Sequence, residues 1–174
     1  MISHGLIESI LCRYALPRDG IHGLSHWARV IENGRKLSEM TGARMRVVEL
    51  FAVFHDSQRI NEGIDKDHGR RGAMLATEFR GKAYELGDED FVLFIQACEL
   101  HTDGLLEGDV TLQTCWDADR LDLGRVGITP RAEKLCTDRA KEAGFFKWAV
   151  KRGEGLLVPA PVLSEWGVQL SPDT

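Results

Sequence analysis

Several features are missing from this sequence, and each absence argues against a class of protein. No apolar stretch approaches the roughly 20 residues that a membrane-spanning helix needs. The first residues lack the basic start and the apolar core of a signal peptide. The net charge of −5 argues against bulk attraction to nucleic acid or to an anionic membrane. We therefore expect a cytoplasmic protein whose partners include neither a nucleic-acid polymer nor a membrane.

Cysteine pairs and strand patterns are also missing. Cys12, Cys98, Cys115 and Cys136 form no CxxC pair, which argues against a structural zinc site and is typical of reduced, packed thiols. No segment reads convincingly as a strand, and the sequence contains no internal repeat. With 174 residues, of which 43% are hydrophobic, the chain is long enough to bury a real core, and we expect one domain over 1–174.

Apolar residues recur at helical spacing through most of the chain, so the expected fold class is all-α. Ser25 is the expected N-cap of the second helix, and Gly42 is its expected end. The tail from Gly153 onward is expected to be irregular apart from one turn near 163–166. The expected helices are 2–15, 26–42, 46–56, 67–80, 90–101, 110–123, 131–143 and 145–151.

The most apolar of these helices ends in two polar residues, His55 and Asp56. Seven of the eight residues from Val47 to Phe54 are hydrophobic, which predicts a buried helix. An unpaired charge at the end of a buried helix is costly. A metal ion removes this cost because it binds a neutral imidazole and an ionised carboxylate together. The sequence therefore points to a metal site at this helix end.

Further histidines occupy comparable positions. Five of the six histidines fall at helix starts, at helix ends or in the loop before a helix, so they can converge from different helices on one bundle site. Histidine and carboxylate ligands suit Mn, Fe, Ni, Co or Zn more than Ca. We expect one divalent transition metal, and the sequence leaves a second ion open. The candidate residues are His26, His55, Asp56, His68, His101 and Asp119.

The order His26…His55-Asp56…Asp119 resembles the H…HD…D pattern of the HD-domain superfamily of metal-dependent phosphohydrolases. The stretch DADRLD over 117–122 strengthens this resemblance, which covers roughly residues 20–130. The resemblance implies an HD-domain helical bundle in which these four residues bind one metal between helices, with Asp56 also catalytic. It further implies that the ion lowers the pKa of a bound water, which then attacks a phosphorus. The segment 131–174 adds helices and a tail outside the motif.

Cations near the motif favour an anionic substrate. Superfamily members that hydrolyse guanosine tetraphosphate or 5′-deoxynucleotides carry an acidic residue three positions after the HD aspartate, where this chain has Arg59. The HD-GYP phosphodiesterases carry a lysine there, although their GYP loop is missing here. Arg59 is therefore a candidate catalytic and phosphate-binding residue. Further phosphate-binding candidates are Arg29, Lys66 and Arg70.

Two histidines, His68 and His101, have alternative roles by the same resemblance. They match in order the histidines that bind a second metal in HD-GYP enzymes and in di-iron oxygenases of the superfamily. In mononuclear members, residues at similar places contact phosphate instead. Capping of a helix end is the alternative role for each of them.

For the other polar residues near the motif, we expect roles other than direct metal binding. His22 is expected to be a loop residue, with a place at the rim of the site, four residues before His26, as the alternative. Asp117 and Asp122 are expected to be solvated or ion-paired, with support of the site from behind the ligands as the alternative. Arg120 and Arg125 are weaker candidates for phosphate binding, and an ion pair with Asp117 is the alternative role for Arg120.

These observations predict a metal-dependent phosphohydrolase that cleaves a phosphoester or diphosphate bond. The expected partner is a small phosphorylated molecule, such as a nucleotide or another metabolite. Two alternatives come from other classes. The first is a di-iron HD-type oxygenase, and the second is a sensor module that binds a metal or a nucleotide without turnover. The oligomeric state stays open.

Overall fold

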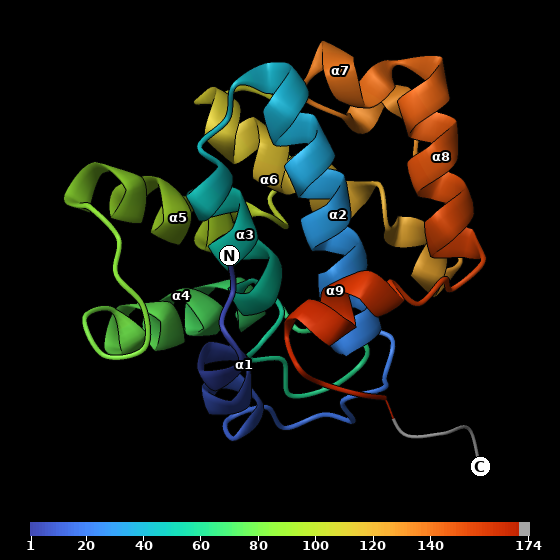
Figure 1. Ribbon diagram of the computed structural model, residues 1–174. Coiled ribbons are helices and arrows are strands. Elements are labelled where there is room, and N and C mark those ends of the chain that lie inside the picture. Colours follow the sequence, from blue (N-terminus) through green and yellow to red (C-terminus); the bar gives the residue numbers. More distant parts are fainter. Residues whose placement is uncertain (171–174) are drawn as a thin grey trace.

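The chain folds into helices joined by loops, as the sequence predicts (Figure 1). The computed structural model describes residues 1–170, and the only extended pairing within them is an isolated bridge between Arg80 and Tyr84. The all-α prediction is therefore confirmed. The α-helices are α1 His4–Leu11, α2 Leu24–Thr41, α3 Met45–Phe54, α4 His68–Phe79, α5 Asp88–Leu100, α6 Val110–Arg120, α7 Asp138–Lys141, α8 Ala143–Glu154 and α9 Ala160–Glu165.

Helix α3 is the centre of the bundle. Every residue from Val47 to Phe54 is buried, as the apolar run predicts. The helix packs against α2, α4, α5 and α6, which surround it in Figure 1. It ends at His55, whose backbone N–H still bonds the Phe51 carbonyl. The side chains of His55 and Asp56 therefore emerge where several helices meet.

Some helix boundaries differ from the predicted ones. Helix α2 begins two residues before His26, with Gly23 rather than Ser25 at its N-cap position, and no side chain caps it. It ends as predicted at Gly42, whose φ of 77° is the left-handed conformation that glycine adopts without strain. Helix α1 ends at Leu11 rather than near residue 15.

The largest error in the prediction lies after Pro130. A helix over 131–143 was expected, but the structure has a 3₁₀ turn, Ala132–Lys134, and then the four-residue α7. The reason is that the backbone N–H groups of Cys136 and Thr137 donate to the Asp117 carboxylate, at 2.7 and 2.8 Å, instead of to helical carbonyls. Helix α8 is longer than predicted, and α9 replaces the single expected turn.

The buried apolar residues form one large cluster and one small cluster. The large cluster surrounds α3 and includes Cys98 and Cys115, whose thiols have pKa values raised well above the usual range by burial. These two cysteines are packed thiols, as predicted, whereas Cys12 is exposed. The small cluster joins α2 to the C-terminal helices. Its buried members are Leu37, Leu121, Leu135, Ala140, Ala149 and Val150.

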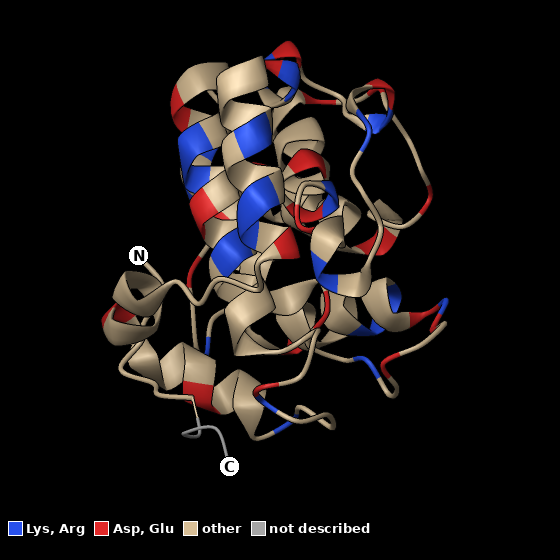
Figure 2. Cartoon of the chain, turned by 90° about the vertical axis from the view of Figure 1, so that its right-hand side faces the viewer, with Lys and Arg blue, Asp and Glu red and all other residues tan. Residues whose placement is uncertain are grey.

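The surface carries charges of both signs. In Figure 2, Lys and Arg are interspersed with Asp and Glu over the face that the view presents. Several form ion pairs between distant segments, such as Arg35 with Glu165 at 2.6 Å. Within residues 1–170, no helix combines the length and the apolar character that crossing a bilayer requires.

Gly72 brings α4 close to the end of α3, and replacing it with alanine is expected to destabilise the fold. A Cβ at this position would lie 2.4 Å from the Phe54 carbonyl oxygen and 3.2 Å from that of His55. Both are backbone atoms, so helix α4 must shift, and we expect the free energy of unfolding to fall by about 1–3 kcal/mol. Denaturant unfolding measures this change. Gly144→Ala in α8 is the matched control, since a Cβ there meets no atom within 4 Å; an equal loss in both variants would contradict the packing argument.

Candidate metal centre

The end of α3 and the first turn of α2 bring a first group of ligand atoms together. His26 Nε2 and His55 Nε2 lie 3.1 Å apart. The Oδ2 atom of Asp56 lies 3.4 Å from the first of these nitrogens and 3.8 Å from the second. All three side chains are buried, and their ligand atoms are close enough together to hold one metal ion.

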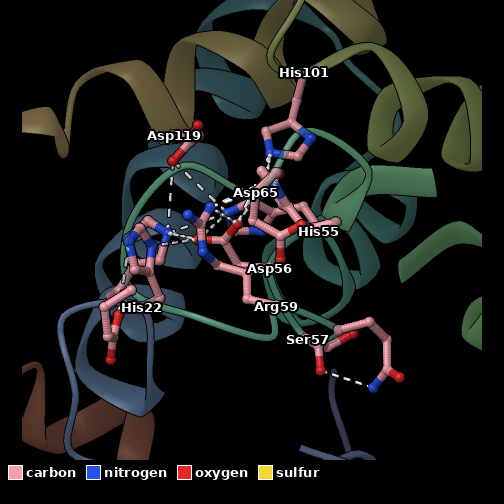
Figure 3. Close-up of polar contacts among 12 residues, drawn as sticks. His22, His55, Asp56, Ser57, Arg59, Asp65, His101 and Asp119 are labelled. Carbon is pink, nitrogen blue, oxygen red and sulfur yellow. Dashed lines mark hydrogen bonds and ion pairs between the residues drawn. The ribbon is translucent and has the colours of Figure 1, made fainter. Parts of the chain in front are cut away.

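Helix α6 adds Asp119 to this group. Its Oδ1 atom lies 3.5 Å from His26 Nε2 and 3.7 Å from His55 Nε2. Figure 3 shows Asp119 and His101 directed toward Asp56 from different helices. The Oδ1 atom is buried and has no hydrogen-bond partner within the described part of the chain. A buried carboxylate oxygen without a donor is costly, and a bound cation would satisfy it. The structure thus brings together the four residues expected to bind one metal.

A second group lies on the other side of Asp56. The Oδ1 atom of Asp56 is 3.0 Å from His68 Nε2 and 3.9 Å from His101 Nε2. The two Nε2 atoms are 2.9 Å apart. His68 begins α4, and His101 follows the last residue of α5. The carboxylate of Asp56 therefore stands between two pairs of histidines, with one oxygen toward each pair.

The outer nitrogens of these histidines determine their tautomers. The Nδ1 atoms of His55 and His101 donate to the carbonyls of Phe51 and Cys98, at 3.1 and 2.7 Å. His68 Nδ1 likewise donates to the Asp65 carbonyl. Because a carbonyl oxygen only accepts, each Nδ1 carries the hydrogen and each Nε2 presents its lone pair inward.

His26 has a carboxylate behind it instead of a carbonyl. Its Nδ1 lies 2.7 Å from Asp122 Oδ2. Two neutral imidazoles that face each other with lone pairs at about 3 Å repel one another, unless a cation lies between them. With metal–nitrogen bonds of about 2.1 Å, two ligand nitrogens lie about 3.0 Å apart at the right angle of octahedral geometry and about 3.4 Å apart at a tetrahedral angle. The spacing within each histidine pair therefore fits a bound divalent ion.

The pKa values of three of the buried groups agree with a ligand role. Burial, with a smaller contribution from the cation Arg125, lowers the pKa of His26. Burial and the neighbouring His55 lower the pKa of His101 to about 4, so its imidazole is neutral near pH 7. Burial raises the pKa of Asp56, but the surrounding histidines outweigh it and hold that pKa well below the usual range. The pKa of His55 shifts the other way: burial lowers it, but the carboxylates of Asp56 and Asp119 outweigh burial and raise it. Neutral His26 and His101 beside an ionised Asp56 are the protonation states that metal binding needs.

Arg125 belongs to the site, although the sequence singled it out only weakly. It lies in the 3₁₀ turn Leu123–Val126, and its guanidinium is buried. Its Nη2 is 3.7 Å from Asp56 Oδ2, and its Nη1 is 3.7 Å from Asp119 Oδ1. Its Nε donates to the Ile21 carbonyl at 3.1 Å, which fixes the group in place. This permanent charge offsets part of the carboxylate charge around the ligands.

His22 is part of the same buried network rather than a residue at its rim. Its Nδ1 lies 2.8 Å from Asp56 Oδ2, and its Nε2 lies 3.7 Å from Glu62 Oε2. The sequence placed His22 in a loop, but spacing alone does not reveal that the loop folds inward over the metal ligands.

Asp122 and Arg29 lie behind His26. Only 1% of the Asp122 side chain is exposed, so this carboxylate is not solvated; it is ion-paired with Arg29, which was the other form of the expectation. Its Oδ1 accepts from Arg29 Nε at 2.7 Å. Arg29, which was expected to bind phosphate, is itself buried. Its Nη1 donates a hydrogen bond to the Leu157 carbonyl. Its guanidinium therefore helps to hold Asp122, which in turn orients His26.

The alternative pair between Arg120 and Asp117 does not form. The Asp117 carboxylate instead accepts from the backbone of Cys136 and from Thr137, through both its backbone N–H and its hydroxyl. Arg120 donates to the Leu105 carbonyl at 2.8 Å. Both residues lie within two positions of Asp119 in sequence, but their hydrogen bonds connect α6 with the following loops.

A cleft of about 400 Å³ opens beside the second ligand group. Two of the predicted phosphate-binding cations, Arg59 and Lys66, line it together with His68. Arg59 Nη1 is 3.4 Å from Asp56 Oδ1, and its Nη2 donates to the Gly63 carbonyl at 2.5 Å. Arg70 is exposed and does not line the cleft. The other lining residues are Gly63, Ile64, Asp65, Thr102 and Asp103.

Comparison with known proteins identified no relative of this chain. No protein-family model matches the chain, and searches of curated proteins and of solved structures found no match. The argument for the site therefore rests on its own residues and geometry.

The contact behind His26 leads to a prediction about metal affinity. Asp122→Asn keeps the shape of the side chain but removes the charge that holds the His26 ring and its tautomer. Loss of such an outer partner typically weakens metal binding by about 10- to 100-fold, and we expect a loss in this range. Competition with a chelator of known affinity measures it. Asp138→Asn, which removes an exposed carboxylate paired with Lys141, is the control and should bind metal as the wild type does.

Proposed function

We propose that this protein is a metal-dependent phosphohydrolase that acts on a small phosphorylated molecule and holds two divalent ions. The observation that carries the proposal is the Asp56 carboxylate, with Oδ2 toward the pair His26 and His55 and Oδ1 toward the pair His68 and His101. One carboxylate shared by two ligand groups is suited to bridging two ions.

The donor set limits which ions fit. Four imidazole nitrogens and two aspartates offer no thiolate, and such mixed N/O ligands suit Mn, Fe, Co, Ni or Zn. Ions of this kind act as Lewis acids on phosphoryl oxygens and supply an activated water. Asp119 belongs to the first group, beside His26 and His55, and His68 and His101 complete the second.

The protein side chains would position the substrate. Arg59 and Lys66 in the cleft present cations to an anionic phosphoryl group, and the Arg59 fork matches two phosphoryl oxygens. Arg125 adds a fixed positive charge beside Asp56 and Asp119, which favours the negative charge that develops during phosphoryl transfer. The cleft volume is within the range of small-molecule sites, so a nucleotide or a similar metabolite fits this role better than a polymer.

One observation favours a second candidate, a di-iron oxygenase. His68 and His101 have Nε2 atoms 2.9 Å apart beside Asp56, so their grouping supports a second ion as strongly as the first. A six-ligand centre rich in imidazole also suits iron. The cations in the cleft suit an anionic phosphorylated substrate and give no advantage to a reaction with O₂. We therefore rank hydrolysis above oxygenation.

Metal analysis combined with two activity assays tests the proposal. The protein is purified, its metal content is determined, and it is reconstituted separately with Mn, Fe, Co, Ni and Zn. Hydrolysis of p-nitrophenyl phosphate, bis-p-nitrophenyl phosphate and a nucleotide panel is then followed beside oxygen consumption. Metal-dependent phosphate release would support the proposal. Oxygen uptake with two irons would favour the oxygenase, and nucleotide binding without turnover would favour a sensor; either result would overturn hydrolysis.

A further inference from the structure

A second cavity, with no metal ligand among its lining residues, contains a buried cation. It has a volume of about 290 Å³, and most of its lining is apolar. Arg120 lines it, although only 8% of this residue is exposed. The lining residues are Gly104, Arg120, Leu123, Pro130, Arg131, Lys134 and Leu135.

The Arg120 guanidinium has hydrogen-bond partners but no counter-charge. Its nitrogens donate to the carbonyls of Leu105 and Lys134 and to the sulfur of Cys136, at 2.8, 3.2 and 3.2 Å. No carboxylate within residues 1–170 forms an ion pair with it, because Asp117 is engaged by the backbone of 136 and 137. A buried guanidinium without an anion is costly, so something other than the visible acidic residues is needed to balance it.

The position of Arg120 is fixed before any ligand arrives. Three neutral acceptors hold its guanidinium, and its planar group lies 5.9 Å from the centre of the Trp116 ring. Lys134, on the exposed side of the cavity, also has no ion pair within the described chain. Arg131 also lines the cavity but is paired with Glu133 at 3.4 Å. Of the three lining cations, Arg120 and Lys134 thus have no ion pair within residues 1–170, and the walls formed by Leu123, Pro130 and Leu135 are apolar. A fixed guanidinium recognises carboxylate or phosphate groups well, since its fork matches two oxygens.

We propose that this cavity binds a small organic anion, with its carboxylate or phosphate head on Arg120 and Lys134 and its apolar body against Leu123, Pro130 and Leu135. The volume is near the lower end of the range for small-molecule sites, which is about 300–1,000 Å³. The anionic head group would balance the buried charge of Arg120, and transfer of the apolar body from water into the cavity would favour binding. The proposal does not depend on the phosphohydrolase assignment.

Calorimetric titration of the purified full-length chain tests the site. The probes are octanoate and phenyl phosphate, which separate a carboxylate from a phosphate head, and 1-octanol is the neutral analogue. Saturable binding of at least one anion at concentrations up to about 10 mM, with 1-octanol about tenfold weaker or worse, is the expected result. No saturable binding of either anion, or equal binding of 1-octanol, would overturn the proposal.

Two charge-reversal variants localise the binding. Lys134→Glu places an anion beside Arg120 at an exposed position and is expected to weaken binding of the anion by about tenfold or more. Lys147→Glu makes the same change of net charge at an exposed position in α8 that does not line the cavity, and should leave affinity within about twofold. Equal effects in both variants would indicate bulk electrostatics. Unchanged affinity in Lys134→Glu would indicate binding at the metal centre. Either outcome would contradict the proposal.

Arg120→Gln provides a second measurement at the buried cation itself. It should abolish binding of the anion while removing an uncompensated charge from the interior. Amide NMR spectra of the wild type report location independently, because the anion should shift the signals of Gly104 and Leu135 on the cavity wall. Shifts confined to residues around Asp56 would overturn the assignment.

Discussion

Asp56→Asn is expected to reduce the metal content of the purified protein from about two ions per chain to less than one, and to reduce hydrolysis to background. The reason is that both oxygens of this carboxylate face ligand nitrogens: Oδ2 is 3.4 Å from His26 Nε2, and Oδ1 is 3.0 Å from His68 Nε2. Asparagine offers one oxygen and no charge. Both ion positions therefore lose a ligand through a single substitution.

The measurement is elemental analysis of variant and wild type, purified in parallel and reconstituted with the same metals. Circular dichroism shows whether the variant is folded, and Asp56→Glu, which keeps the charge on a longer side chain, should retain part of the metal. Asp67→Asn is the matched control. It removes an exposed carboxylate that precedes α4 and caps nothing through its side chain. A folded Asp56→Asn protein with full metal content would exclude Asp56 as a ligand and remove the basis of the proposed function.

The sequence predicted which inner residues come together better than it predicted the residues that hold them. The apolar run placed His55 and Asp56 at the end of a buried helix, and the resemblance to the H…HD…D order added His26 and Asp119. The structure brings these four side chains to one place. It also brings His68 and His101 beside Asp56, whereas the sequence left their role open.

The supporting residues were harder to predict because their roles depend on contacts across the chain. Asp122 lies 96 residues after His26, and Arg125 lies 103 residues after His22. Nothing in the local sequence indicates that these side chains are buried, so the sequence alone indicates a solvated or ion-paired carboxylate at Asp122 and a weaker phosphate-binding candidate at Arg125. The 3₁₀ turn after α6 returns the chain toward the loop 17–23 and buries both side chains.

The prediction for the segment after Pro130 was wrong for a related reason. Helical spacing of apolar residues predicted a helix over 131–143, but the buried Asp117 carboxylate offers the backbone of Cys136 and Thr137 a competing acceptor. Thr137 then caps the short α7 through its hydroxyl, which accepts from the Ala140 N–H at 3.2 Å. A side chain 20 residues away thus decides where the helix begins, and local propensity does not contain that information.

His68→Ala and His101→Ala are each expected to remove one ion of two, while the other stays bound. These histidines face Oδ1 of Asp56, whereas His26, His55 and Asp119 surround the position at Oδ2. If catalysis needs both ions, hydrolysis should fall on the order of 10²- to 10³-fold, which is typical when one major source of electrostatic stabilisation is lost. Elemental analysis and steady-state kinetics measure the two effects on the same preparations.

The double variant distinguishes a shared ligand role from two separate helix-end roles. If both histidines bind one ion, the second substitution removes a ligand from a position that is already empty. The double variant should then match the single variants in metal content and rate. If His68 and His101 instead cap α4 and α5, metal content should be unchanged, and each substitution should lower the free energy of unfolding. Asp119→Ala supplies the complementary control, because it should empty the position beside His26 and His55 first. Loss of the same ion in all of these variants would mean that the centre holds a single metal, with His68 and His101 among its ligands.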